Sequence, residues 1–525
     1  MDSHMNDAES QTPRTQVLIV GAGPTGLVLA LWLTKLGISV RIIDKTAGAA
    51  PFSRALAVHA RTLEFYRQLG IADDVVGQGI KVRAANLWVR AARAARVPFA
   101  QIGEGLTPFP FVLEVAQDVH ERLLIEQLGA LGVTVERRTE LLVFEESPNG
   151  MRATLGRSDG SAEICEATYL AGCDGAHSTV REGLSIGFPG GTYTHVFYVA
   201  DVEADGASVD DEVHVDLDVA DLLAVFPMRD TGRVRLVGTV RDEPGRCGGD
   251  LTFDDVRSRP TEQLKLAIKK VNWFSTYRVH HRVVTSFRRG CVFLVGDAAH
   301  IHSPVGGQGM NTGIGDSVNL AWKLAAVLNG SAKDDLLDSY EQERIVFARR
   351  LVATTDRIFD VASSPGPVAA YLRTRIAPRL VPLLIRLSAV RRFLFRTVSQ
   401  IGISYRHSAL SVGSSGAIRG GDRLPWVERV QSDAGFIDNF SPLTSLHWQV
   451  HVYGEPLSGL RERCTELGLP LQMFAWTPGM KRAGLVNGGL YLVRPDGYVA
   501  LADAGSDPER LSQYITTRGL APASN

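Results

Sequence analysis

The chain has 525 residues, 45% of them hydrophobic and 22% charged, which is enough for a large core divided over about three domains. Its 56 basic residues nearly balance 57 acidic ones, and this excludes a strong overall attraction to nucleic acid. No window of about 18 residues is apolar and free of glycine or charge, so we expect no membrane span. The five cysteines have neither CxxC nor metal-like spacing, which predicts reduced thiols, a cytoplasmic location and no metal site.

The first predicted element is a buried parallel strand at residues 17–20, followed by a glycine-rich turn and an apolar helix. The turn has the spacing Gly21-x-Gly23-x-x-Gly26, and a second strand ends at Asp44. The first glycine permits a tight turn, the second lets a pyrophosphate approach the backbone, and the third permits close helix–strand packing. This unit predicts dinucleotide binding, with Asp44 accepting hydrogen bonds from a ribose.

Two further strand–loop junctions follow later in the chain. Residues 167–172 lead into Asp174, and residues 291–295 lead into Asp297. Between these junctions, from about residue 190 to 285, alternating runs predict antiparallel strands that cover the cofactor and supply a substrate pocket.

A glycine-rich segment after Asp297 predicts a surface for a flat cofactor. Five glycines lie within the ten residues 306–315, and a long helical pattern follows Gly313. Without side chains, the segment exposes backbone amides, and a flat ring can lie against it. The helix N-terminus would stabilise the negative charge of a reduced flavin.

Helical patterns continue to about residue 405. The arginine-rich apolar stretch 375–398 predicts an amphipathic helix packed on the protein body rather than one lying on a membrane. A composition rich in Gly and Ser predicts a linker at 406–421, and the remaining residues, 422–525, predict a small separate α/β domain.

In combination, these motifs resemble the class A flavoprotein monooxygenases, the family of p-hydroxybenzoate hydroxylase, phenol hydroxylase and the polyketide-tailoring aromatic hydroxylases. The resemblance implies an α/β fold: a Rossmann-like FAD-binding domain, an inserted antiparallel-sheet substrate domain and a thioredoxin-like C-terminal domain. The expected FAD-binding domain comprises 14–190 and 285–405, and the substrate domain 191–284. The C-terminal domain has one cysteine, Cys464, so we expect it to be redox-inactive.

The family's motifs also imply how FAD is held. Asp297 is expected to contact the ribityl chain, and Pro304 to face the reactive edge of the flavin. Arg54 and Gln117 match positions beside the cofactor. The expected cofactor-binding residues are Gly21, Gly23, Thr25, Gly26, Asp44, Lys45, Arg54, Gln117, Asp174, Asp297, Pro304, Gly307, Gly309, Met310 and Asn311.

The resemblance implies a monooxygenase that consumes NADPH or NADH and O2 and hydroxylates a phenolic or polycyclic aromatic small molecule through a flavin C4a-hydroperoxide. The catalytic candidates are Pro304, His214 and Arg229; Tyr198 and Tyr277 also lie in the substrate segment, whereas His300 is expected to be structural. The same fold could instead perform epoxidation, Baeyer–Villiger oxidation or antibiotic-inactivating oxygenation. A flavin-binding protein that acts through partners is a more distant alternative. We expect a monomer or homodimer.

Overall fold

The computed structural model describes residues 14–49, 55–99, 102–148, 150–218, 221–229, 232–241, 251–364, 366–428, 430–432 and 435–521. In this part of the chain, the first sheet contains β1 (Arg14–Val20), β2 (Val40–Asp44), β8 (Glu136–Arg137), β9 (Thr139–Ser147), β10 (Gly150–Arg157), β11 (Ala162–Gly172), β17 (Arg288–Arg289) and β18 (Val292–Leu294). Its centre is parallel, in the order β18-β11-β1-β2-β8. The apolar run of β1 is buried because helices cover it, as expected for a parallel strand.

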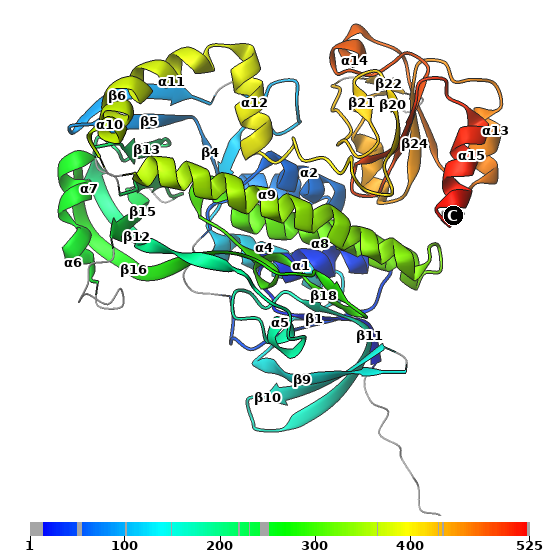
Figure 1. Ribbon diagram of the computed structural model, residues 1–525, viewed down its shortest axis with the longest axis horizontal. Helices are drawn as coiled ribbons and strands as arrows, with labels where there is room; N and C mark the ends of the chain where they lie inside the picture. Colours follow the sequence, from blue (N-terminus) through cyan, green and yellow to red (C-terminus); the bar gives the residue numbers. More distant parts are fainter. Residues whose placement is uncertain are drawn as a thin grey trace, which may run out of the picture.

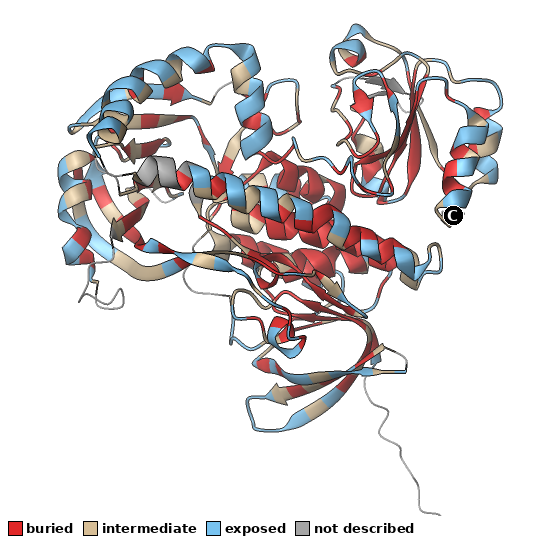
Figure 2. Ribbon diagram, in the orientation of Figure 1, coloured by how far each residue is buried: buried red, intermediate tan, exposed pale blue. Residues whose placement is uncertain are grey.

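Helices pack closely around this sheet. The largest are α1 (Pro24–Lys35), α4 (Gln117–Ala130), α8 (Gln308–Leu328) and α9 (Asp338–Ser363). Figure 2 shows α1, α8 and the central strands as the most buried part of the molecule. Gly313 permits the close contact between α8 and α1, because a Cβ there would lie 2.4 Å from Oγ1 of Thr25.

The second sheet lies on the left in Figure 1, beside the first sheet. Its strand order is β19-β16-β12-β15-β14-β13-β5-β6. Its strands are β5 (Ala84–Val89), β6 (Ala92–Pro98), β12 (Gly190–Gly206), β13 (Val213–Asp216), β14 (Leu223–Pro227), β15 (Arg233–Arg241), β16 (Leu266–Val283) and β19 (His300–Ile301). One face packs against the short helices α6 (Phe253–Val256) and α7 (Ser258–Gln263). The sequence division 191–284 misses β5 and β6, which join this sheet through a parallel pairing of β5 with β13.

A small antiparallel sheet, β3-β7-β4, lies between the two large sheets. It contains β3 (Ala57–Val58), β4 (Ile80–Val82) and β7 (Val112–Glu114), and α2 (Ala60–Leu69) and α3 (Ala72–Gln78) connect its strands. The short helix α5 (Thr179–Gly183) follows β11. The small sheet therefore brings residues 57–114 next to the second sheet, and side chains of both sheets line one cavity.

The arginine-rich stretch forms helices on the protein body. It contains α10 (Pro367–Tyr371), a π-helical turn, α11 (Ala377–Ile385) and α12 (Ser388–Val398), and α11 packs against β6. Their outer faces carry exposed apolar side chains, among them Leu383 and Phe393. None of the helices in the described ranges has the length and apolar character to cross a membrane.

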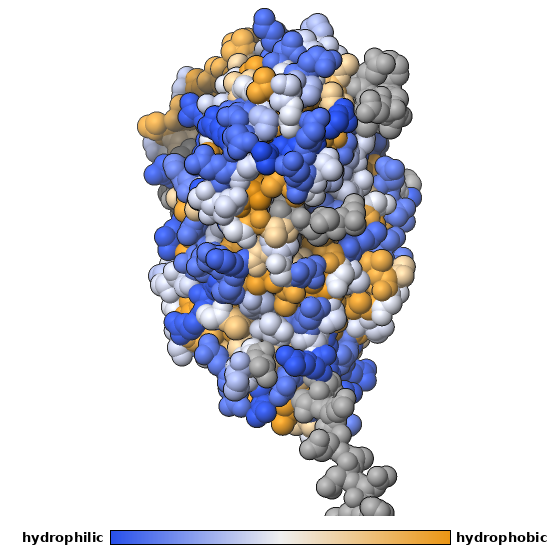
Figure 3. All heavy atoms as spheres, turned by 90° about the vertical axis from the view of Figure 1, so that its right-hand side faces the viewer, coloured by the Kyte–Doolittle hydropathy of each residue, from blue (hydrophilic) through white to orange (hydrophobic). Residues whose placement is uncertain are grey.

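The C-terminal sheet has the order β21-β20-β27-β26-β24-β25. Its elements are β20 (Val412–Ser415), β21 (Ile418–Arg419), β24 (Gln449–Tyr453), β25 (Leu471–Phe474), β26 (Gly489–Val493), β27 (Val499–Asp503), α13 (Leu460–Glu466), α14 (Pro478–Arg482) and α15 (Pro508–Thr517); a separate hairpin comprises β22 (Val430–Ser432) and β23 (Gly435–Ile437). The predicted linker 406–421 is wrong, because β20 and β21 lie within it and β20 pairs in parallel with β27. Figure 3 shows the side of the molecule that carries this sheet as largely hydrophilic, with small separate hydrophobic groups.

Candidate active site

The glycines of the first turn meet different surroundings. A Cβ at Gly21 would lie 2.4 Å from the Cys173 carbonyl oxygen, and one at Gly26 would lie 2.0 Å from the Gly21 carbonyl oxygen. A Cβ at Gly23 would meet no atom within 4 Å. Gly23 is also the N-cap of α1, and no side chain caps that helix. The structure thus leaves open space before the free amides of a helix N-terminus, which suits a pyrophosphate.

Asp44 ends β2 beside this turn. Its Oδ2 accepts a hydrogen bond from the Ala22 amide at 2.7 Å, and its Oδ1 accepts one from the Thr46 amide at 2.8 Å. A carboxylate has about four acceptor positions, so Asp44 retains capacity for a ribose hydroxyl. Lys45, the next residue, is exposed.

The glycine-rich segment lies at the carboxyl end of β18. The 3-10 turn Gly296–Ala298 comes first and holds the exposed Asp297 between two buried residues. Thr25 packs against this turn, because a Cβ at Gly296 would lie 2.8 Å from its Oγ1. Asp297 and the turn of Gly21 therefore lie at the same edge of the first sheet, where α/β proteins bind ligands.

The segment 304–311, here called the glycine loop, turns directly into α8. Gly306 and Gly307 have φ angles of 79° and 61°, a backbone conformation that favours glycine. Pro304 is half-buried at the start of the loop. Helix α8 begins at Gln308, before the expected start after Gly313, and has no side-chain cap. Gly309, Met310 and Asn311 consequently belong to its first turn, and the amides of Gly309 and Met310 precede the first intrahelical hydrogen bond, which the Asn311 amide makes.

Buried side chains hold the glycine loop in place. Asn311 accepts hydrogen bonds from the His59 amide at 2.8 Å and from Oγ1 of Thr62 at 2.7 Å. It donates to the carbonyl oxygens of Ala57 and Gly307. The Asn311 side chain thus joins β3 and α2 to the loop and fixes the position of the first turn of α8.

Three buried histidines lie in or beside the loop. His59 Nε2 lies 3.1 Å from the Gly306 carbonyl oxygen, and burial lowers the pKa of His59 to about 4. Burial also lowers the pKa of His302 to about 4; its Nε2 is buried without a hydrogen-bond partner in the described structure. His300 lies 2.7 Å from Asp316 and stacks on Phe287, which fits the structural role expected for it.

The segment after β11 approaches the turn of Gly296. Oδ2 of Asp174 accepts a hydrogen bond from the Val180 amide at 3.1 Å, whereas Oδ1 is buried without a partner in the described structure. Burial raises the pKa of Asp174. Arg181 is buried and donates to the carbonyl oxygens of Ala298 and Ala176, so it ties this segment to the turn of Asp297.

Gln117 begins α4, and its Nε2 donates to Oε1 of Glu121 at 2.7 Å. Its Oε1 accepts a hydrogen bond from the Ala55 amide at 3.3 Å. Gln117 is therefore next to the segment that follows Arg54, and Arg54 itself lies outside the described residues.

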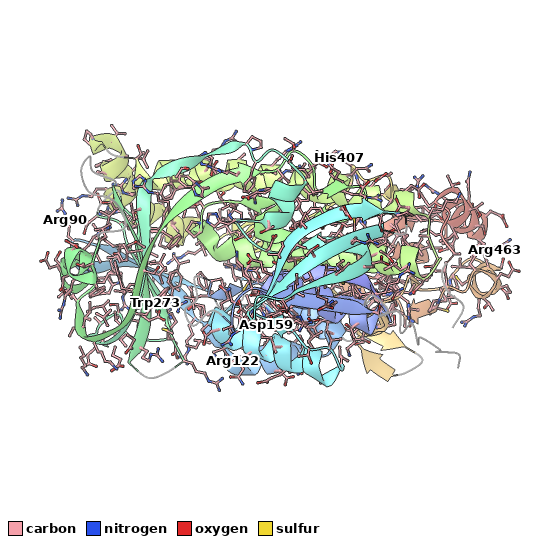
Figure 4. All side chains as sticks on the ribbon, turned by 90° about the horizontal axis from the view of Figure 1, so that it is seen from below. Arg90, Arg122, Asp159, Trp273, His407 and Arg463 are labelled. Carbon is pink, nitrogen blue, oxygen red and sulfur yellow. The ribbon has the colours of Figure 1, made fainter. Side chains whose placement is uncertain are left out.

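A cavity of about 320 Å³ opens between the second sheet and the small sheet. Trp273 and Arg122, which Figure 4 labels, lie on its two sides, from β16 and α4. Across the cavity, Arg235 of β15 forms a bidentate ion pair with Asp201 of β12, with distances of 2.5 and 2.7 Å. The remaining wall residues are Leu56, Gln78, Ile80, Glu114, Ala116, Asp118, Val119, Pro227, Met228, Arg229, Arg233 and Asn272.

One wall residue of this cavity is adjacent in sequence to the support of the glycine loop. Leu56 of its wall precedes Ala57, and a Cβ at Gly307 would lie 2.8 Å from the Cβ of Ala57. An aromatic ligand in the cavity would therefore lie near a flat cofactor on the loop. A second cavity of about 700 Å³ lies beside the C-terminal sheet, but none of the expected cofactor or substrate residues lines it.

The strand register separates the catalytic candidates. His214, Val225, Leu236 and Ala200 form one row across the second sheet, on the face that packs against α6. Asp201 and Arg235 belong to the adjacent row and face the cavity, because successive side chains point to opposite faces. His214 is fully buried, and Trp88 and Asp210 occupy its two ring nitrogens. His214 therefore lies away from this cavity, and its expected catalytic role stays a prediction.

The other candidates differ in position. Tyr198 packs with the α6 face, like His214, whereas Tyr277 pairs in register with Phe197 on the opposite face. Arg229 lies at the exposed rim of the cavity and donates to Gln78 and to the Gly77 carbonyl oxygen, both at 2.8 Å. No group of three metal-ligating side chains occurs in the described part of the chain.

The sequence reasoning missed Glu114, Asp201, Arg235 and Trp273 as cavity residues. A signal was present in Asp201, a single charge within the apolar run of β12. Glu114 ends the short apolar strand β7 in the same way. Their convergence depends on pairing between segments distant in sequence, and no local pattern contains it.

Comparison with known proteins gives consistent results. A family model described as FAD binding domain matches residues 14–355. The chain is 34% identical to 6-methylpretetramide 4-monooxygenase of Streptomyces rimosus, covering 97% of this chain and 94% of the relative. It is 32% identical to rifampicin monooxygenase of Rhodococcus hoagii, covering 74% and 79%. The solved structure of OxyS anhydrotetracycline hydroxylase from Streptomyces rimosus has a TM-score of 0.78 and 28% identity, covering 97% and 100%.

The family match spans more than half of the chain, and the first of these relatives aligns over nearly its full length. The matched residues include the glycine turn, the exposed Asp297 and the glycine loop, the features that the structure places at one edge of the first sheet. The chain therefore belongs to the class A flavoprotein monooxygenases, in the aromatic and polyketide hydroxylase family, and is an FAD-dependent aromatic monooxygenase.

Proposed function

We propose that this monooxygenase uses NADPH or NADH and O2 to hydroxylate a phenolic or polycyclic aromatic substrate in the cavity between the second sheet and β7. The observation that carries the proposal is the cavity itself: about 320 Å³, with Trp273 on one wall and a buried polar group, Glu114, on the other. Its walls mix apolar side chains, among them Leu56, Ile80 and Met228, with charged ones, so the cavity offers both contact surface and polar groups to a small molecule. The relatives named for 6-methylpretetramide and anhydrotetracycline support an aromatic substrate class.

For FAD, we propose that the open space before Gly23 receives the pyrophosphate and that Asp44 binds the adenosine ribose. Asp297 would bind the ribityl chain. The amides of Gly309 and Met310, with Asn311 holding the turn in place, would stabilise charge on the flavin's pyrimidine edge. FAD, when bound, supplies the oxygen chemistry that protein side chains lack.

The side chains have positioning roles in this proposal. Leu56, Ile80 and Met228 supply apolar surface that orients the ring and excludes water, while Trp273 offers an aromatic face. Arg229 lies at the rim, where it can attract a substrate oxygen. Pro304 would define the edge of the glycine loop nearest the substrate.

The test is a screen of substituted phenols and polycyclic aromatics with the FAD-loaded enzyme. We expect slow NAD(P)H oxidation alone, faster oxidation with a suitable phenol, and a product heavier by one oxygen atom. Structure determination of the product then distinguishes ring hydroxylation from epoxidation or Baeyer–Villiger insertion. NAD(P)H oxidation that no aromatic compound accelerates would contradict the proposal.

A further inference from the structure

Glu114 places a buried carboxyl group in the wall of the cavity. It is the last residue of β7 and is only 5% exposed. Its Oε2 is buried and has no hydrogen-bond partner in the described structure. A buried polar atom without a partner costs free energy, so its retention suggests that a ligand completes it.

The nearest cation on the opposite wall is already paired. Arg235 gives two hydrogen bonds to Asp201, and both groups are buried. Arg235 therefore attracts Glu114 only weakly, and burial raises the pKa of Glu114 to about 8. The ordinary value for a glutamate is about 4.3.

Other charged groups surround the cavity without reaching Glu114 through a hydrogen bond recorded in the described structure. The strands paired with β7 contribute only the apolar Ile80 to the wall. The charged residues that line it besides Glu114 are Asp118 and Arg122 of α4, Asp201 of β12, Arg229 after β14, and Arg233 and Arg235 of β15. Each of the two remaining acids is engaged, Asp118 with Arg122 and Asp201 with Arg235. Glu114 is thus the wall acid left for a ligand.

We propose that Glu114 is the catalytic base that takes the proton from the hydroxyl group of the phenolic substrate. This inference rests on the proposed function. The phenolic O–H bond breaks and a new O–H bond forms on the Glu114 carboxylate. The electron pair stays on the phenolate oxygen, which increases the electron density of the ring. The proton later leaves to solvent through the open rim, and no oxidant is required for this step.

The chemistry of the site suits this transfer. A phenol has an ordinary pKa of about 10, so an ordinary glutamate would be too weak a base by nearly six units. The buried Glu114 narrows that gap to about two units, a range in which proton transfer in a reaction is efficient. Arg235, although paired, keeps positive charge across the cavity, where it favours the phenolate.

The test compares Glu114→Gln with the wild type in the FAD-loaded enzyme. Glu126→Gln is the matched control, because Glu126 lies exposed on the neighbouring α4. Three quantities are measured from pH 6 to 9: bound FAD, NAD(P)H oxidation, and product formed per NAD(P)H consumed. The wild type should gain turnover with an apparent pKa near 8.

Glu114→Gln should keep its bound FAD. Its hydroxylation rate at pH 8 should fall about 100-fold or more, and the rise with pH should disappear. Glu126→Gln should match the wild type. A Glu114→Gln variant with wild-type hydroxylation and pH profile would overturn the assignment. A wild type that hydroxylates no phenol would instead contradict the proposed function.

A second variant decides the matter if Glu114→Gln fails to fold. In Glu114→Ala the carboxyl group is missing and acetate can enter the space. Acetate bound in the vacated space is buried as the Glu114 carboxyl group is, and burial raises its pKa in the same way. Added acetate should therefore restore at least 10-fold of the lost hydroxylation rate, with the largest effect at the upper end of the range from pH 6 to 9. Loss of activity without any acetate rescue would overturn the role as a base.

Discussion

The glycines of the first turn have two different functions. Gly21 and Gly26 are required by the protein's own packing, since a Cβ on either would penetrate neighbouring backbone. Gly23 has an ordinary extended backbone, with φ of −76°, and faces open space. Of these three glycines, only Gly23 lacks a packing reason for having no side chain, so its role is to leave space for the ligand.

Gly23→Ala should separate cofactor binding from folding. We expect the apoprotein to unfold at the wild-type temperature, because the new methyl group meets no protein atom. FAD affinity should fall by about 10-fold or more, since the methyl group occupies the space of the pyrophosphate. Fluorescence titration of the apoprotein with FAD measures the affinity, and calorimetry measures stability.

Gly26→Ala is the matched control for that experiment. Its Cβ would lie 2.0 Å from a backbone oxygen, so the apoprotein itself should lose about 1–3 kcal/mol of unfolding free energy. Equal stability of the two variants would show that the glycines do not divide in this way.

The ionisation of Glu114 is also testable through stability. Its folded pKa of about 8 exceeds the unfolded value of about 4.3. Below pH 4.3 the group is protonated in both states, so its ionisation does not change the unfolding free energy. Between these values the unfolded chain ionises first, and Glu114 costs progressively more stability. Glu114→Gln should therefore raise the unfolding free energy by a few kcal/mol at pH 8 and by little at pH 4. A stability difference independent of pH would contradict the elevated pKa.

Individual residues were predictable where the motif itself determines their position. The glycine turn and Asp44 follow from spacing, and the structure puts them at one sheet edge. The side of the sheet that carries His214 could not be predicted, because an alternating strand pattern identifies two faces but not which one lines the cavity. Glu114 was overlooked because its partner strands, β3 and β4, are separated from it in sequence.

At the scale of elements, the glycine loop depends on neutral buried histidines. His59 contacts Gly306 through a ring nitrogen, and His302 is buried two residues before the loop begins. Both have pKa values lowered to about 4 by burial. Protonation of either would place an unpaired charge in the support of the loop.

Acidification should therefore release FAD before the rest of the protein unfolds. The unfolded pKa of histidine is about 6.5, so the stabilising contribution of each ring is complete above that pH and is lost as pH falls toward 4. FAD fluorescence should rise within this window, while far-ultraviolet circular dichroism stays near its neutral value. Release only below pH 3 would contradict the role of the histidines.

The beginning of α8 illustrates what sequence periodicity can resolve. Its apolar face indicates a helix after Gly313, but the structure begins the helix at Gln308. Glycines weaken the helical pattern in this first turn, although the Asn311 side chain fixes it through tertiary hydrogen bonds. Tertiary contacts therefore overrule the local preference.

At the scale of the whole molecule, buried charges fasten the C-terminal sheet to the FAD-binding body. Arg494 donates to Glu343 of α9 at 2.7 and 3.0 Å and also binds Asp496. Lys323 of α8 lies 2.9 Å from Glu343, and Trp322 donates to Asp496. These residues are buried, so the C-terminal part is packed as an integral component.

Arg494→Met should destabilise the protein by about 3–5 kcal/mol, because it leaves buried carboxylates without their cation. Arg463→Met removes a half-buried surface arginine paired with Glu466 and Glu509, and should cost no more than about 1 kcal/mol. Urea unfolding followed by tryptophan fluorescence measures both, since Trp322 and Trp448 pack at this junction. Equal midpoints for the two variants would show that the buried cluster does not hold the junction.

The domain plan was predictable in outline. The order of motifs indicates the FAD-binding and inserted sheets, while β20 looked like a linker because its Val-Gly-Ser-Ser sequence is short and polar. Its strand pairing depends on β27, almost ninety residues later. The thioredoxin-like relationship of the C-terminal part stays a prediction.

A crystal structure of the enzyme with FAD and a turnover-active phenol tests the account most directly. We expect the flavin ring against the glycine loop, the pyrophosphate beside Gly23, and the phenolic oxygen within hydrogen-bond distance of Glu114. A phenol bound on the α6 face of the second sheet, or in the cavity beside the C-terminal sheet, would contradict it.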